Sequence, residues 1–166
     1  MLDWPEILLR LGVATLAGGL IGLNRDLQNK PIGLKTLGLV GLATAMVVVL
    51  ADPSPDHAKI TDAGSRVIQG ILTGIGFLGA GVIIRAEHDF RIRGLTSAAC
   101  TWLAACFGIV CGAGQWRIVG TAMVIAFTLL IIGRRVERWF HRTLGGKDDP
   151  EEHSGASASG VDTPPS

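Results

Sequence analysis

Basic and hydroxyl side chains gather in two clusters that could bind an anion. Lysine and arginine donate hydrogen bonds to oxyanions, and a helix that begins beside them adds free backbone N–H groups and the positive end of its dipole. Apolar segments begin directly after both clusters, so the pattern predicts an anion site at two helix starts. The candidate residues are Asn24, Arg25, Asp26, Lys35, Thr36, Arg85, Arg93, Thr96 and Ser97. Asp26 could orient one of the arginines.

Catalytic and metal-binding patterns find little support in the sequence. The three cysteines are spaced C-x5-C-x4-C, which matches no zinc site, and the histidines lie in links or in the polar tail. Gly74 to Gly79 spells G-x-G-x-x-G, but these glycines lie inside an apolar segment and lack the acid that the dinucleotide fingerprint needs about 20 residues later. We therefore expect no enzyme, no catalytic residue, no metal, no other cofactor and no nucleic-acid partner.

Five apolar segments must position these residues. Each is about 16–18 residues long, at the short end of the range that spans a bilayer. Aspartate and glutamate are absent from all of them, and Arg10 is the only basic residue inside one, as the cost of a charge in lipid demands. The segments are Ile7–Leu23, Thr36–Ala51, Val67–Ile84, Leu95–Gly112 and Ile118–Gly133. They predict an all-α bundle of five transmembrane helices.

The basic residues outside the segments predict the orientation of the bundle. Eleven of them fall on the side of the C-terminus and of the links after the first and third helices, and three fall on the other side. The excess of Lys and Arg marks the cytoplasmic side, so we expect the N-terminus outside and the C-terminus in the cytoplasm. A simpler interpretation of the candidate site remains open here: its basic residues would only set this topology, and its Thr and Ser residues would only cap helices.

The chain divides into a membrane domain and a tail. We expect the membrane domain over residues 1–142 and a disordered tail over residues 143–166, which are rich in Gly, Ser, Pro and acidic residues. A weak repeat is visible inside the domain, because Gly33–Thr36 and Gly94–Ser97 open helices 61 residues apart. It suggests two parallel hairpins plus one helix.

Small residues within the spans predict close helix packing. Small-xxx-small pairs let helix backbones approach, and the third segment is the richest in glycine. Its glycines would either pack against a neighbour or break the helix near residues 76–81, and both alternatives remain open. The glycines concerned are Gly18, Gly22, Gly70, Gly74, Gly76, Gly79 and Gly81. Such faces also favour a homo-oligomer.

Four motifs together resemble the MgtC/SapB family of bacterial inner-membrane proteins. They are GGLIGLNRD from Gly18, KPIGLKT from Lys30, GIGFLGAGVIIR from Gly74 and RIRGLTSAACTW from Arg91. The resemblance runs from about Leu8 to Phe140. It implies a five-helix membrane domain, a role in growth under magnesium limitation and in virulence, and regulation of the F-type ATP synthase as partner.

Two positions depart from the family pattern. The family usually has Glu where this chain has Asn24, and Arg where this chain has Lys35, which keeps the charge but loses bidentate geometry. The chain also resembles members that lack the soluble C-terminal domain.

Two function hypotheses follow. The first is a non-enzymatic, multi-pass inner-membrane protein of magnesium-stress adaptation that regulates a membrane partner such as the F-type ATP synthase. The alternative is an ion transporter or channel, for magnesium or a phosphate-like anion. Gln69, Thr73 and Thr101 are the residues that could line its path.

Overall fold

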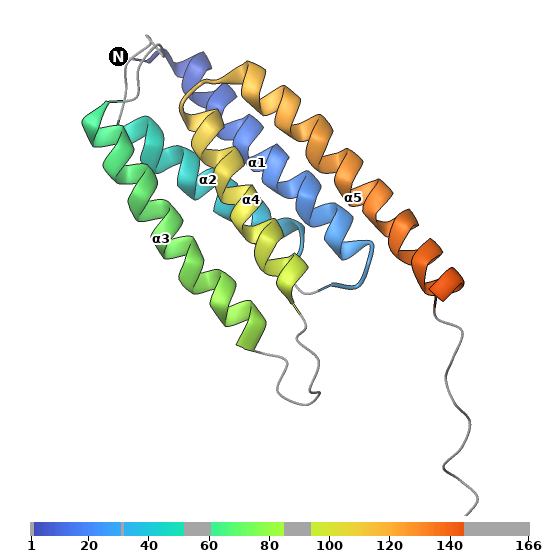
Figure 1. Cartoon of the computed structure of the whole chain (residues 1–166). Coiled ribbons are helices and arrows are strands. Elements are labelled where there is room, and N and C mark those ends of the chain that lie inside the picture. Colours follow the sequence, from blue (N-terminus) through green and yellow to red (C-terminus); the bar gives the residue numbers. More distant parts are fainter. Residues whose placement is uncertain (1, 31, 52–60, 85–93, 145–166) are drawn as a thin grey trace, which may run out of the picture. The chain divides into compact units, whose positions relative to one another are not determined.

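The chain folds into five α-helices within the residues that the structure describes. A computed structural model describes residues 2–30, 32–51, 61–84 and 94–144. The helices are α1 (Trp4–Asp26), α2 (Leu34–Ala51), α3 (Asp62–Ile84), α4 (Leu95–Gly112) and α5 (Trp116–Leu144), as Figure 1 shows. Each is long and apolar enough to cross a membrane. The prediction of an all-α membrane bundle of five helices is therefore confirmed.

Two compact units divide the chain. The first is Met1–Phe127 and the second Thr128–Ser166, so α5 begins in the first unit and ends in the second. The expected disordered tail lies outside the described residues except for Thr143 and Leu144, which still belong to α5.

The core of the first unit is built from α1, α2 and α4, which pack against one another. α1 runs antiparallel to α2, because Gly22 faces Gly33 and Leu34 while Ala14 faces Gly41. A Cβ added at Gly22 would come within 2.6 Å of the Gly33 carbonyl oxygen, so the backbones touch with no room for a side chain. Close backbone approach of this kind replaces the hydrophobic effect as the driving force for helix association in lipid.

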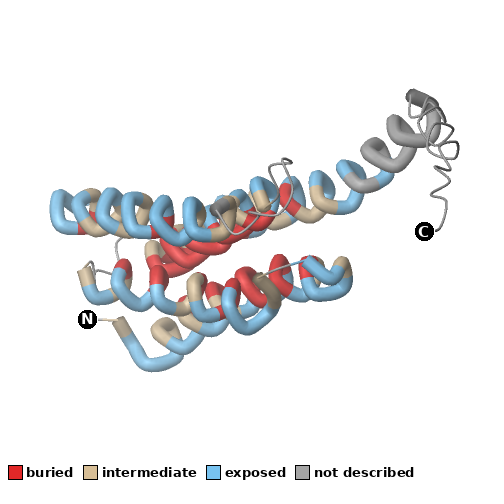
Figure 2. The backbone as a smooth tube through the Cα atoms, turned by 90° about the horizontal axis from the view of Figure 1, so that it is seen from below, coloured by how far each residue is buried: buried red, intermediate tan, exposed pale blue. Residues whose placement is uncertain are grey.

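α2 and α4 run in the same direction and are equally close. A Cβ at Gly112 would meet the Ala45 carbonyl oxygen at 2.8 Å and Val48 at 2.9 Å. Gly108 faces Gly41 and the hydroxyl of Thr44 in the same way. α4 is the helix most covered by its neighbours, with 56% of its span buried inside the protein against 6% for α3. Figure 2 shows the buried residues gathered on the sides of the helices that face one another.

The predicted repeat is visible in the packing. Gly18 of α1 packs on Leu37 of α2, and Gly79 of α3 packs on Ala98 of α4. Gly79 and Ala98 each lie 61 positions after Gly18 and Leu37, the same offset as the repeat in the sequence. The α1–α2 and α3–α4 hairpins therefore use equivalent contacts, but the second hairpin is looser.

α3 is continuous and its glycines are mostly open. The helix runs without interruption from Asp62 to Ile84, so of the two alternatives the break near residues 76–81 is wrong. A Cβ at Gly70, Gly74, Gly76 or Gly81 would meet no atom of the described residues within 4 Å, whereas one at Gly79 would make ordinary contact with Ala98. Packing among the described residues thus accounts for Gly18, Gly22 and Gly79 but not for the other four. Phe77 is 82% exposed on the same helix, as a side chain facing lipid would be.

Candidate functional site

The last turn of α1 carries a buried arginine to the first turn of α4. Arg25 is only 2% exposed, and its Nη2 donates a hydrogen bond to the hydroxyl of Ser97, itself buried. Its guanidinium also lies beside the thiol of Cys100. The sequence pattern predicts Arg25 and Ser97 in one site, and the antiparallel packing of α1 on α4 brings them together.

The charge of Arg25 lacks a carboxylate partner among the described residues. Its one charged neighbour in the sequence, Asp26, forms no ion pair with it, and Arg25 Nε has no hydrogen-bond partner in the described part of the chain. α4 begins at this point behind Gly94, which has a φ of 98° and offers no side chain to cap the helix. A buried cation therefore lies at the positive end of a helix dipole.

Asp26 has a different role from the one expected. Its Oδ2 accepts a hydrogen bond of 2.8 Å from the backbone N–H of Leu34, so it caps α2 instead of orienting an arginine. This capping contact requires glycine at position 33, because a Cβ there would collide with the Asp26 carboxylate. The chain enters α2 through Ile32 at a φ of 69°, which β-branched residues rarely adopt. The Asp26 bond therefore anchors a strained helix entry.

The remaining candidates divide by exposure. Lys35, Thr36 and Thr96 are exposed at the same end of the helices, and Asn24 is partly buried and accepts a hydrogen bond at its backbone oxygen from Gln28. Among the described residues, the side-chain hydrogen bond of Arg25 goes to Ser97 and to none of these three. Arg85 and Arg93 lie outside the described residues.

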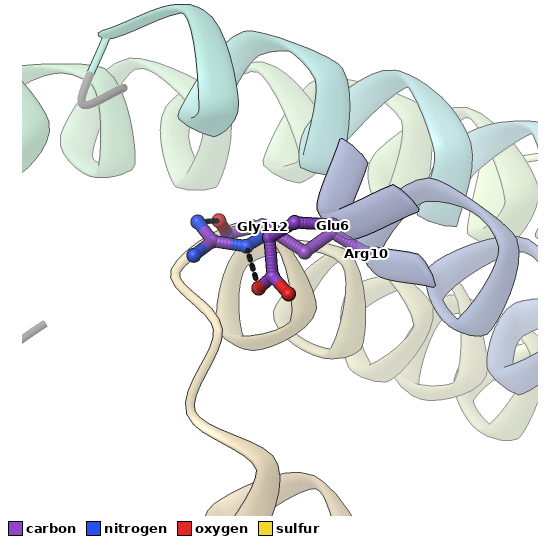
Figure 3. Close-up of polar contacts among 3 residues, drawn as sticks. All are labelled: Glu6, Arg10 and Gly112. Carbon is purple, nitrogen blue, oxygen red and sulfur yellow. Dashed lines mark hydrogen bonds and ion pairs between the residues drawn. The ribbon is translucent and has the colours of Figure 1, made fainter. Parts of the chain in front are cut away.

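A second buried arginine, at the opposite end of α4, was not among the sequence candidates. Arg10 is 1% exposed, and its Nε forms an ion pair of 2.8 Å with Glu6, one helical turn earlier. Its Nη1 donates to the carbonyl oxygen of Gly112, the last residue of α4, at 2.8 Å (Figure 3). The i, i+4 spacing of Glu6 and Arg10, with the arginine inside an apolar segment, was the signal that could have identified it.

The two arginines have opposite electrostatic settings on one helix. Arg10 faces the C-terminus of α4, where orphan carbonyls and the negative dipole end favour a cation, and it also has a carboxylate. Arg25 faces the N-terminus, where the dipole opposes it. The Arg10 site therefore stabilises the fold, whereas the Arg25 site has no carboxylate partner among the described residues.

The polar residues considered for a transport path do not come together. Thr73 bonds to the backbone of Gln69 on α3, and both are exposed. Thr101 is buried on α4, where its hydroxyl donates to the Ser97 carbonyl oxygen at 3.0 Å. The hydroxyls of Thr73 and Thr101 thus each bond within their own helix, and these three residues line no common path.

Comparison with known proteins places the chain in a family. The model of the MgtC family matches residues 11–139. The chain is 36% identical over 152 residues to Protein SapB of Bacillus subtilis, covering 87% of this chain and 63% of that protein. It is 38% identical over 149 residues to Protein SrpB of Synechococcus elongatus, covering 82% and 79% respectively.

Protein MgtC of Salmonella typhimurium is a further relative, 37% identical over 134 residues, with 79% of this chain and 54% of that protein covered. The chain thus spans between about half and four fifths of the length of these relatives. No solved structure matches it. The match over most of its length and the five membrane-spanning helices show that the chain is a multi-pass membrane protein and belongs to the MgtC family.

Proposed function

We propose that this chain is a non-enzymatic protein of the bacterial plasma membrane that serves adaptation to magnesium limitation, of the kind associated with virulence. It acts by binding and restraining a membrane partner, the F-type ATP synthase. Membership of the MgtC family supports the physiological setting. The closed packing of the first unit is the observation that carries the mechanism, because it favours action through a surface over transport through a pore.

The packing is closed where a path would have to run. α1, α2 and α4 meet backbone to backbone, and an added Cβ at Gly41 would lie 2.5 Å from the Ala14 carbonyl oxygen. Thr44, the buried hydroxyl between α2 and α4, donates to its own helix at Val40. An ion crossing here would lose its hydration shell without gaining ligands, which is prohibitive in lipid. The buried hydroxyl of Thr44 is therefore structural.

The test measures the partner and its activity together. The full chain would be expressed at graded levels, and ATP-driven proton pumping would be followed in inverted membrane vesicles with a fluorescent ΔpH probe. We expect the rate of proton pumping to fall as the expression level of the chain increases at constant synthase content. We also expect the synthase to co-purify with the tagged chain in mild detergent. Absence of both effects would contradict the proposal.

A matched variant separates a specific effect from crowding of the membrane. Gly22→Leu would push α1 and α2 apart. This variant should still insert into the membrane but should no longer inhibit the synthase. Gly70→Leu, on the open side of α3, should keep the fold. A parallel assay in liposomes with Mg²⁺ or inorganic phosphate would expose transport. Flux in the liposomes without synthase inhibition would favour the transporter instead.

A further inference from the structure

The inference concerns the charge balance at the first turn of α4, and it does not depend on the proposed partner. A buried guanidinium costs considerable free energy unless a negative group accompanies it. Arg10 meets that requirement with Glu6 and with the Gly112 carbonyl. Arg25 is as deeply buried as Arg10, but its partners among the described residues are the neutral groups of Ser97 and Cys100.

The start of α4 adds backbone donors beside Arg25, whereas the last turn of α1, which carries Arg25, presents carbonyl groups without a full negative charge. The first-turn N–H groups of a helix have no intrahelical acceptors, and Gly94 supplies no side-chain cap to α4. Arg25 Nε, also without a partner among the described residues, adds a further donor. Leu95 and Thr96 are exposed, so this turn is open to solvent or to lipid heads on one side. Arg25 contacts Ser97 in the first turn of α4, so donors of an arginine and of a helix N-terminus lie beside each other, which suits a tetrahedral oxyanion.

We propose that a phosphate group binds at the first turn of α4, against the guanidinium of Arg25. The phosphate belongs either to the head of an anionic lipid or to free inorganic phosphate, since both present the same oxygens. It supplies the negative charge that Arg25 lacks among the described residues. It also joins the end of α1 to the start of α4, so occupancy of the site tightens the contact between the two hairpins.

The experiment measures binding on the purified, delipidated full chain in a neutral detergent. Equilibrium dialysis with radiolabelled inorganic phosphate should give one bound phosphate per chain if the ligand is free phosphate. Nanodiscs of phosphatidylcholine with and without phosphatidylglycerol provide the lipid arm, in which the anionic lipid should raise the Tm by roughly 5 °C. Phosphate binding in detergent identifies the free ion, and a response to the anionic lipid alone identifies the lipid head. No effect in either arm overturns the proposal.

Variants locate the site. Arg25→Gln should weaken binding at least tenfold, and Arg25→Lys should retain part of it, because lysine keeps the charge but not the fork of donors. Lys35→Gln is the matched control, since Lys35 is an exposed cation at the same end. An equal loss in Lys35→Gln would point to diffuse surface charge and overturn the site. The dialysis on the unmodified chain decides the question even if Arg25→Gln does not fold.

A carboxylate from the chain itself is the competing counter-charge. Residues 85–93 include Glu87 and Asp89, and Glu87 lies 61 positions after Asp26 in the repeat. The double variant Glu87→Gln with Asp89→Asn should bind phosphate at least as well as the unmodified chain. If phosphate or anionic lipid acts only on the double variant, a carboxylate fills the site and the proposal is wrong.

Discussion

Arg10 and Glu6 form the clearest stabilising interaction that a single substitution can test. Glu6→Gln removes the carboxylate and leaves the buried guanidinium with the Gly112 carbonyl. Because Glu6 is 33% exposed, water screens part of the loss, and we expect a cost of about 1–2 kcal/mol. Denaturation in mixed micelles of increasing SDS fraction measures the change.

The control for this substitution is Asp3→Asn. Asp3 stands at the same end of α1 and is exposed, and its side chain makes no capping bond. The Asp3→Asn substitution should lower the free energy of unfolding by a few tenths of a kcal/mol at most, because it weakens the interaction of residue 3 with the helix dipole. Equal effects of the two substitutions would mean that net charge, and not the Arg10 contact, determines the stability.

Asp26 provides a second test at the residue scale. Asp26→Ala removes the cap on the Leu34 N–H and should cost about 1 kcal/mol. Because Asp26 forms no ion pair with Arg25 in the described structure, this variant should bind phosphate normally. Loss of phosphate binding in a folded Asp26→Ala protein would restore the initial interpretation, in which Asp26 orients the arginine.

The helices differ in whether close packing requires their glycines. The requirement depends on the helix that carries the glycine and on its neighbours. Gly22→Ala drives a Cβ into the backbone of Gly33 and Leu34, so α1 and α2 must separate, at a cost of about 1–3 kcal/mol. Gly74→Ala meets open space and should leave stability unchanged or raise it by up to about 1 kcal/mol through helix propensity. The free energy of unfolding in detergent measures both.

The outcome distinguishes packing within the chain from packing between chains. Retained stability in Gly74→Ala with a large loss in Gly22→Ala agrees with the described contacts. A large loss in Gly74→Ala would show that α3 has a neighbour outside the first unit. The expected homo-oligomer remains a prediction, and native mass spectrometry of the purified chain measures the number of copies.

Orientation is a prediction for the whole molecule. The uneven distribution of Lys and Arg predicts that the C-terminus faces the cytoplasm. A fluorescent protein fused after Ser166 should therefore fluoresce, and alkaline phosphatase at the same point should be inactive. A phosphatase in the link at residues 52–60 should be active. The reverse pattern would place the candidate site on the outer face.

Composition and pattern determined the membrane class, the five helices, the repeat and the family of this chain. These properties follow from local sequence, because an apolar span of sufficient length must become a helix in lipid whatever its neighbours are. The same reasoning identified Arg25 and Ser97 as members of one site, since equal depth in the bilayer follows from topology alone.

Only the tertiary structure decided which charges are compensated. Asp26 is adjacent to Arg25 in the sequence, yet its carboxylate accepts a hydrogen bond from the backbone N–H of Leu34. Arg10 of α1 donates a hydrogen bond to the carbonyl of Gly112, the last residue of α4. The tertiary structure also decided that Gly18 and Gly22 of α1 and Gly108 and Gly112 of α4 pack closely, while most glycines of α3 do not. The compensation of charges and the packing of glycines both depend on the rotation of each helix about its axis and on which helices are neighbours. Contacts distant in sequence fix these features, so no local pattern contains them.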